Sequence, residues 1–230
     1  MAAGNSIRDE IKEQKKKFKD LTFSEKTQYI WIYYRYVILG VIIAAALIGY
    51  GIKSFVDNNY DNVCMIVVAD GYIEDWDKDS DALTTGFTDY LGIDGKKQRI
   101  DFDYNYSLVP KDYDQDVDVS IQKIYTLSST GSMDGYMTDK EYIDYFSSKR
   151  EAFLYDLSEL LSADEMNALS DHLVYYTTGE GNTIPFAVDL SDSKVIKESG
   201  LTIKTPCYGI PVTAQNIDNA VAFIRYAYNL

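Results

Sequence analysis

Two tetrapeptides in this 230-residue chain place a serine and a lysine three residues apart, which is the spacing used by one class of serine hydrolase. They are Ser120-Ile-Gln-Lys123 and Ser191-Asp-Ser-Lys194, and in that class the serine hydroxyl is the nucleophile. The pattern is short, it occurs twice, and the motifs that accompany it in that class are absent from the sequence. A hydrolase is therefore only a minor alternative, and we expect that the protein is not an enzyme.

Other residues that carry chemistry are sparse or wrongly spaced. His172 is the only histidine, so the sequence has no histidine cluster for zinc, and a histidine beside a predicted strand is more often structural than catalytic. The run from Asp75 to Asp81 has carboxylates at alternate positions, as a calcium loop has. However, Ser80 and Gly86 stand where that loop needs a glycine and a glutamate. We therefore expect no metal site and no cofactor.

Cys64 and Cys207 are the only two cysteines. Both lie in apolar runs that are predicted to be strands, where a free cysteine is commonly buried. A location outside the cytoplasm would also permit a disulfide bond. The sequence leaves both alternatives open: two buried free thiols, or a Cys64–Cys207 disulfide.

One apolar segment is long enough to cross a membrane. Tyr36 to Ile52 contains 17 residues without a charge, close to the lower limit for a bilayer, and the aromatic cluster before it suits the headgroup interface. We expect a transmembrane helix over 29–53, which is the contact with the lipid bilayer, after a basic segment at 1–28 and before a linker at 54–61. Ala44-Ala45-Ala46 keeps a cleaved signal peptide as an alternative, and a buried core helix is another.

The charge distribution orients this helix. Residues 1–53 contain nine Lys or Arg and five Asp or Glu, whereas residues 54–230 contain 13 and 31. Basic flanks stay on the cytoplasmic side, so we expect a cytoplasmic N-terminus, one membrane crossing and an extracytoplasmic domain over 62–230. The acidity of that domain argues against nucleic acid as a partner.

Hydrophobic periodicity divides the domain into alternating strands and helices. Strands are predicted at 62–70, 99–107, 134–139, 172–177, 184–190 and 207–213, and helices at 80–91, 138–146, 157–161, 162–169 and 217–228. The run at 114–131 fits both periods. This alternation predicts an α/β domain with helices packed on a mixed, mostly parallel sheet.

Two stretches of the domain resemble bacterial extracellular solute-binding proteins. The matching residues are Gly131, Asp134, Phe153, Asp156, Leu157, Ser158 and Glu159 in the first stretch, and Asn216, Asn219, Ala220, Val221, Phe223 and Ile224 in the second. The resemblance implies a type 2 periplasmic-binding-protein-like fold with a helix at 117–130. Because the chain is short, it implies one reduced lobe or a compact pair of lobes.

The same resemblance implies a ligand site after the first strand. Asp70, Tyr72 and Trp76 follow that strand, at the end of a parallel sheet where α/β proteins bind ligands. We therefore expect a non-catalytic binding or sensing module that is anchored in the bacterial plasma membrane and takes a small solute. The alternative is an accessory subunit of a transporter or envelope complex, with a membrane-protein partner and no small ligand.

Overall fold

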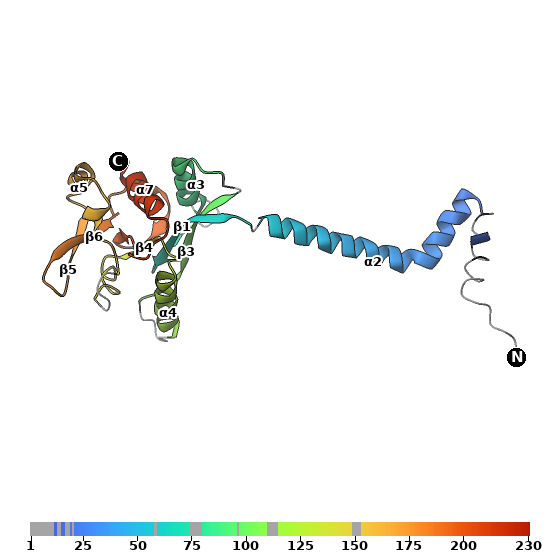
Figure 1. The fold of residues 1–230 in the computed structure, drawn as a ribbon, viewed down its shortest axis with the longest axis horizontal. Helices are drawn as coiled ribbons and strands as arrows, with labels where there is room; N and C mark the ends of the chain where they lie inside the picture. Colours follow the sequence, from blue (N-terminus) through green and yellow to red (C-terminus); the bar gives the residue numbers. More distant parts are fainter. Residues whose placement is uncertain are drawn as a thin grey trace. The chain divides into compact units, whose positions relative to one another are not determined.

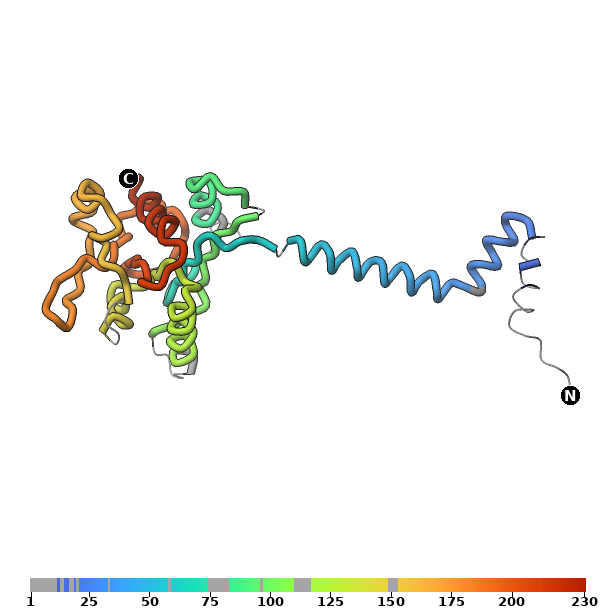
Figure 2. Tube along the Cα trace, viewed as in Figure 1, coloured from blue at the N-terminus to red at the C-terminus, as the bar shows by residue number. Residues whose placement is uncertain are grey.

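The chain folds into two compact units, Met1–Asn59 and Tyr60–Leu230. The computed structural model describes residues 12, 15, 16, 19, 21–57, 59–73, 80–95, 97–109, 115–148 and 153–230. A single long helix dominates the first unit, and the second unit is an α/β domain (Figures 1 and 2).

The helix of the first unit is α2 (Phe23–Asp57). At its start, Thr22 donates its backbone amide and its hydroxyl to the Glu25 carboxylate, at 2.8 and 2.7 Å. The stretch Tyr34–Asp57 is long and apolar enough to cross a membrane, and none of it is buried inside the protein. The helix continues through residues 54–57, the start of the predicted linker, because the sequence there contains no helix-breaking residue.

The second unit is built on a six-stranded sheet in the order β3-β1-β4-β8-β6-β5. The strands are β1 (Asp61–Ala69), β3 (Gln98–Tyr106), β4 (Gly135–Asp139), β5 (Leu173–Thr177), β6 (Thr183–Asp189) and β8 (Pro206–Gly209). β1 is parallel to β3 and to β4, whereas β8 is antiparallel to β4 and β6, and β5 is antiparallel to β6. Four of the six strands therefore run in one direction, and the predicted α/β class with a mixed, mostly parallel sheet is confirmed.

Helices cover both faces of this sheet. α3 (Ser80–Leu91) connects β1 to β3 and packs with α7 (Ile217–Tyr228) on one face, while α4 (Gln115–Ser129) connects β3 to β4 on the other (Figure 1). Successive side chains of β1 point to opposite faces of the sheet. Ile66 packs into the core under α3 and α7, and Val67 packs into the core beside α4. The remaining elements are β2 (Tyr72–Ile73), β7 (Leu201–Thr202), α5 (Ala163–Ala168), α6 (Lys194–Glu198) and the 3-10 helix η1 (Leu157–Glu159).

The structure decides the secondary structure of two segments, 114–131 and 138–146. The ambiguous run at 114–131 is the helix α4. The predicted helix at 138–146 is wrong, because Thr138 is a buried residue of β4 and residues 140–148 form successive turns. Asp139 stabilises those turns: its carboxylate accepts the Glu141 amide at 3.0 Å and the Thr205 amide at 3.0 Å.

The structure also decides between the two alternatives for the cysteines. Cys64 and Cys207 are both free and fully buried. Cys64 belongs to the core under α3 and α7, whereas Cys207 belongs to the core on the opposite face, with β4 between their strands. Two strand spacings amount to about 10 Å, which exceeds the reach of a disulfide, so the possible disulfide is not formed.

A buried carboxylate holds α7 against the sheet. Asp134, just before β4, accepts the backbone amides of Gln215 and Asn216 on Oδ1 at 3.0 and 2.7 Å. Its Oδ2 accepts the Met65 amide and the Asn216 side-chain amide, both at 3.0 Å. Asp134 and Asn216 were matched in the resemblance to solute-binding proteins, and their role here is to join β1, β4 and the start of α7.

Candidate functional site

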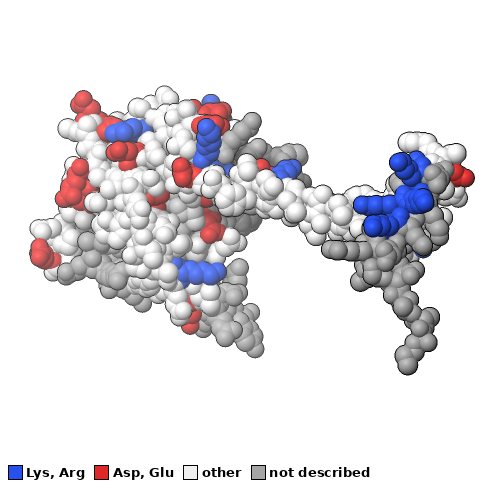
Figure 3. All heavy atoms as spheres, turned by 45° about the vertical axis from the view of Figure 1, so that its right-hand side comes forward, with Lys and Arg blue, Asp and Glu red and all other residues white. Residues whose placement is uncertain are grey.

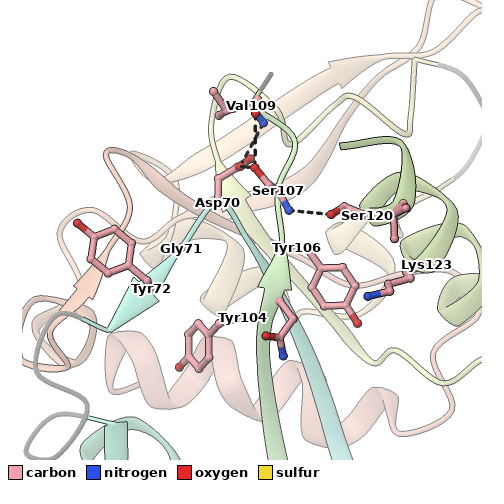
Figure 4. A pocket seen from close by; sticks show the side chains of 11 residues that line it. Asp70, Gly71, Tyr72, Tyr104, Tyr106, Ser107, Val109, Ser120 and Lys123 are labelled. Atoms are coloured by element: carbon pink, nitrogen blue, oxygen red, sulfur yellow. Dashed lines mark hydrogen bonds between the residues drawn. The ribbon is translucent and has the colours of Figure 1, made fainter. Parts of the chain in front are cut away.

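The chain leaves β1 and β3 toward opposite faces of the sheet. β1 leads to α3 on one face, and its parallel neighbour β3 leads to α4 on the other. In α/β proteins this divergence opens a crevice outside the carboxyl ends of the two strands, where ligands bind. A pocket of about 570 Å³ lies at this position (Figure 4).

Three segments line the pocket. The turn after β1 contributes residues 70–72, the end of β3 and the loop after it contribute 104–107 and Val109, and α4 contributes Val119, Ser120 and Lys123. Figure 4 shows Tyr72 on one side of β3 and Lys123 on the other. The lining thus mixes aromatic and aliphatic surface with hydroxyls, one amide and one ammonium group.

Asp70 ties the end of β1 to the loop after β3. Its Oδ1 accepts the Leu108 amide at 2.8 Å, the Ser107 hydroxyl at 3.1 Å and the Val109 amide at 3.2 Å. Its own amide donates to the Tyr106 carbonyl at 2.9 Å. Its φ of 56° is in the left-handed region, which aspartate tolerates better than most residues. Asp70 therefore shapes the pocket wall, while its Oδ2 is buried with no partner among the described residues.

Gly71 follows Asp70 in the pocket wall. A Cβ at this position would lie 2.7 Å from Val68 Cγ1 and 2.8 Å from Ile203 Cδ1. A larger residue would therefore push these two side chains aside at the start of β2.

The structure brings together one of the two serine–lysine pairs. Ser120 and Lys123 both line the pocket from α4, one helical turn apart. The Ser120 hydroxyl is buried and accepts the Ser107 amide at 3.0 Å. Ser120 thus positions the loop after β3, and Lys123 lines the pocket from the same helix.

Two of the pocket tyrosines, Tyr104 and Tyr106, have raised pKa values. Burial raises the pKa of Tyr104 to about 12. Burial also raises the pKa of Tyr106, and so does the Asp103 carboxylate, to which its hydroxyl donates at 2.8 Å. These side chains therefore offer ring surface and hydrogen bonds, not a base.

Of the three predicted ligand residues, the structure places two in the pocket. Asp70 and Tyr72 line it, and whether they contact a ligand stays a prediction. Trp76 lies outside the described residues, as does most of the acidic run at 75–81. Within the described chain, no group of three or more His, Cys, Asp or Glu side chains is placed to hold a metal ion.

The sequence did not indicate that β3 and α4 form walls of the pocket. The alternation of 99–107 predicts the strand β3, but only its parallel pairing with β1 brings Ser107 beside Asp70. The helix that the resemblance implies at 117–130 contains Val119 and Lys123, but nothing in the sequence places that helix beside β3. His172, expected to be structural, packs its ring 4.7 Å from the Tyr228 ring.

No family model, curated protein or solved structure matches this chain. The resemblance to solute-binding proteins therefore has no support beyond the residues quoted for it. The geometry of the pocket carries the functional argument alone.

Proposed function

We propose that this protein is a membrane-anchored extracytoplasmic binding or sensing module, and that its ligand occupies the pocket at the ends of β1 and β3. The observation that carries this proposal is where exposed apolar side chains gather. In the described part of residues 60–230, six large apolar or aromatic side chains are exposed. Three of them, Tyr72 (56% exposed), Val109 (39%) and Val119 (47%), line this one pocket.

Such a grouping favours binding over chance exposure. Single apolar side chains scattered over a surface need no explanation, whereas a cluster of them marks an interaction site. Ligand pockets combine apolar walls with a few polar groups that fix orientation, and here Asn105, Ser107 and Lys123 supply those groups. The engaged Ser120 hydroxyl supports a role without catalysis.

The anchoring part of the proposal depends on α2 and on charge. Tyr34–Asp57 could cross a bilayer. Lysines gather on the N-terminal end of the first unit, and acidic side chains are spread over the second (Figure 3). By the positive-inside rule, the N-terminus would be cytoplasmic and the domain would face outward. We infer a bacterial plasma membrane location from this pattern.

The alternative is an accessory subunit that binds a membrane protein and no small ligand. The exposed apolar side chains would serve that role too. A cavity is not needed for it, so the presence of a 570 Å³ pocket among those side chains favours the binding module.

A thermal-shift screen of the full chain in lipid nanodiscs tests the proposal. Amino acids, sugars and short peptides are the compounds, and we expect at least one of them to raise the Tm. Saturating ligand at about 100 times Kd adds roughly 2.7 kcal/mol of stability. Tyr72→Ala should remove most of the shift, whereas Tyr175→Ala, an equally exposed tyrosine on β5, should leave it intact. If no compound acts, or if the two variants respond alike, the proposal fails.

A further inference from the structure

β3 is an edge strand of nine residues. Among the described residues, β3 pairs with β1 alone, so the backbone groups of alternate residues point away from the sheet without a strand partner. Such an edge is a template for another extended chain unless it is short, bulged or covered. β3 has nine residues, and the extra residue that its register with β1 shows between Asp103 and Tyr106 confines the regular part of this edge to Gln98–Asp103.

The pocket lies at the carboxyl end of this edge. Tyr104 packs against the core under α3 and α7, whereas Tyr106 belongs to the core on the opposite face. The register shift between Asp103 and Tyr106 turns these two side chains to opposite faces, and both line the pocket. Figure 4 shows β3 running through the middle of the pocket, with Tyr104 and Tyr106 on it.

The pocket continues as a groove along α4. A second cavity of about 350 Å³ shares Tyr106, Val119 and Lys123 with the first and extends to Thr126 and Leu127. A strand edge on one side and a helix on the other are the two walls used when an extended peptide adds to a sheet. The backbone of the strand then supplies affinity, and the pocket selects a side chain.

The acidity of the domain favours a cationic partner. Asp101 and Asp103 lie on β3 together with one cation, Arg99, and Lys123 lines the pocket from α4. Opposite charges facing each other across two strands are stabilising. Residues 54–230 contain 13 basic and 31 acidic side chains, so a basic segment would also be attracted from a distance.

We propose that the occupant of the pocket is a cationic, extended polypeptide segment that adds to the free edge of β3 and places an apolar side chain between Tyr72 and Val119. This inference rests on the proposed function, because it names the ligand of the same pocket. Backbone pairing ends before Asn105, whose amide already donates to Asp103 Oδ1 at 3.1 Å. The next residue of the segment then enters the pocket.

A selection from random peptides tests this inference. A display library of twelve-residue peptides is panned against the full chain in lipid nanodiscs, and the selected peptides are synthesised and their Kd measured by fluorescence anisotropy. We expect peptides enriched in Lys, Arg and β-branched residues. Tyr72→Ala and Val119→Asp should each weaken binding at least tenfold, and Tyr175→Ala should change it less than twofold.

Two further measurements distinguish strand addition from other modes of binding. Methylation of alternate backbone amides removes hydrogen-bond donors but keeps every side chain; in one of the two registers it should weaken binding at least tenfold. Amide hydrogen exchange of β3 should slow at least fivefold on binding, while exchange of β5, the opposite edge, stays unchanged.

The outcomes separate this inference from the proposed function. Selection of no peptide, selection of acidic peptides, or binding that tolerates methylation in both registers overturns the inference. If sugars or amino acids raise the Tm through Tyr72 while no peptide is selected, the proposed function stands and only the peptide ligand is wrong. If neither experiment finds a ligand, both fail.

Discussion

Two aspartates mark opposite ends of the parallel strands, and their surroundings differ. Asp134, before β4, is buried and receives four hydrogen bonds shared equally by its two oxygens. Asp70, after β1, receives three on Oδ1 and none on Oδ2 among the described residues. At the amino end of β4, both oxygens of Asp134 are used in hydrogen bonds within the fold. At the carboxyl end of β1, Asp70 uses one oxygen to hold the loop after β3 beside the pocket.

The two aspartates show how a carboxylate that stabilises the fold differs from one that borders a pocket. A buried carboxylate whose two oxygens both accept hydrogen bonds within the fold, such as Asp134, is explained by its contribution to stability. A carboxylate with one unpartnered oxygen beside exposed apolar side chains lies where, under the function we propose, a ligand binds. Each of the following experiments tests one side of this comparison.

The largest effect is expected for Asp134→Ala. The change removes four hydrogen bonds and leaves three backbone amides without their acceptor, at about 1 to 3 kcal/mol for each buried group. We expect a loss of about 3 to 5 kcal/mol, measured by denaturant unfolding of the full chain followed by near-UV circular dichroism. A loss under about 1 kcal/mol would contradict the stabilising role that we assign to Asp134.

Asp70→Ala should have a smaller effect on stability. Three donors lose their acceptor, but the loop after β3 lies near the surface, where water replaces part of the interaction. We expect a loss of about 1 to 3 kcal/mol in the same unfolding measurement. Ligand binding at the pocket should also be lost, since the loop that carries Ser107 and Val109 is released.

Asp70→Asn and Asp134→Asn test whether the two positions differ in the number of carboxylate oxygens that the fold uses. Asn keeps one acceptor oxygen, which is enough at position 70, where only Oδ1 is used, but not at position 134, where both oxygens accept. We expect Asp70→Asn to cost under about 1 kcal/mol and Asp134→Asn about 2 kcal/mol. Equal costs at the two positions would remove the distinction.

Acid should also weaken the ion pair between Glu165 of α5 and Arg225 of α7. The Arg225 guanidinium donates to this carboxylate at 2.6 Å, and with the Ser162 amide it lowers the pKa of Glu165 to about 2. Because the folded pKa is depressed, the stabilisation is complete above about 4.5 and is lost as the pH falls toward 2. We expect about 1 kcal/mol for this partly exposed pair, measured as the pH dependence of unfolding in that window, and Glu165→Gln should reduce that dependence by about the same amount, leaving the part that comes from the other carboxylates, such as Asp189.

The smallest effect on stability is expected for Tyr72→Ala. Its ring is mostly exposed, and such substitutions usually change stability by less than about 0.5 kcal/mol. Unfolding should therefore match that of the wild type while the ligand-induced Tm shift disappears. A large destabilisation would mean that Tyr72 belongs to the core and not to a site.

Much of the fold could be predicted because its signals are local. The apolar run of β1, the i, i+4 pattern of α3 and the capping box of α5, in which Ser162 and Glu165 exchange hydrogen bonds, depend on neighbours in the sequence. The helix expected at 138–146 failed because tertiary contact decides that region: Thr138 has the spacing of a cap, but its burial in β4 excludes one.

The site was predictable only in part for the same reason. Asp70 and Tyr72 follow a recognisable strand, so their place at its carboxyl end could be inferred. The partners that complete the pocket, Tyr104 on β3 and Lys123 on α4, join them through the order of strands in the sheet. No spacing within the sequence encodes that order.

The two unpaired cysteines have a consequence for how the domain matures. Burial raises the pKa of Cys207 to about 12, and burial with the nearby Asp134 raises that of Cys64 as well. Both thiols stay protonated and shielded, and so resist oxidants and alkylating reagents while the domain is intact. The native fold therefore needs no disulfide-forming machinery, and the rate at which the thiols become reactive to a labelling reagent reports how often the domain opens.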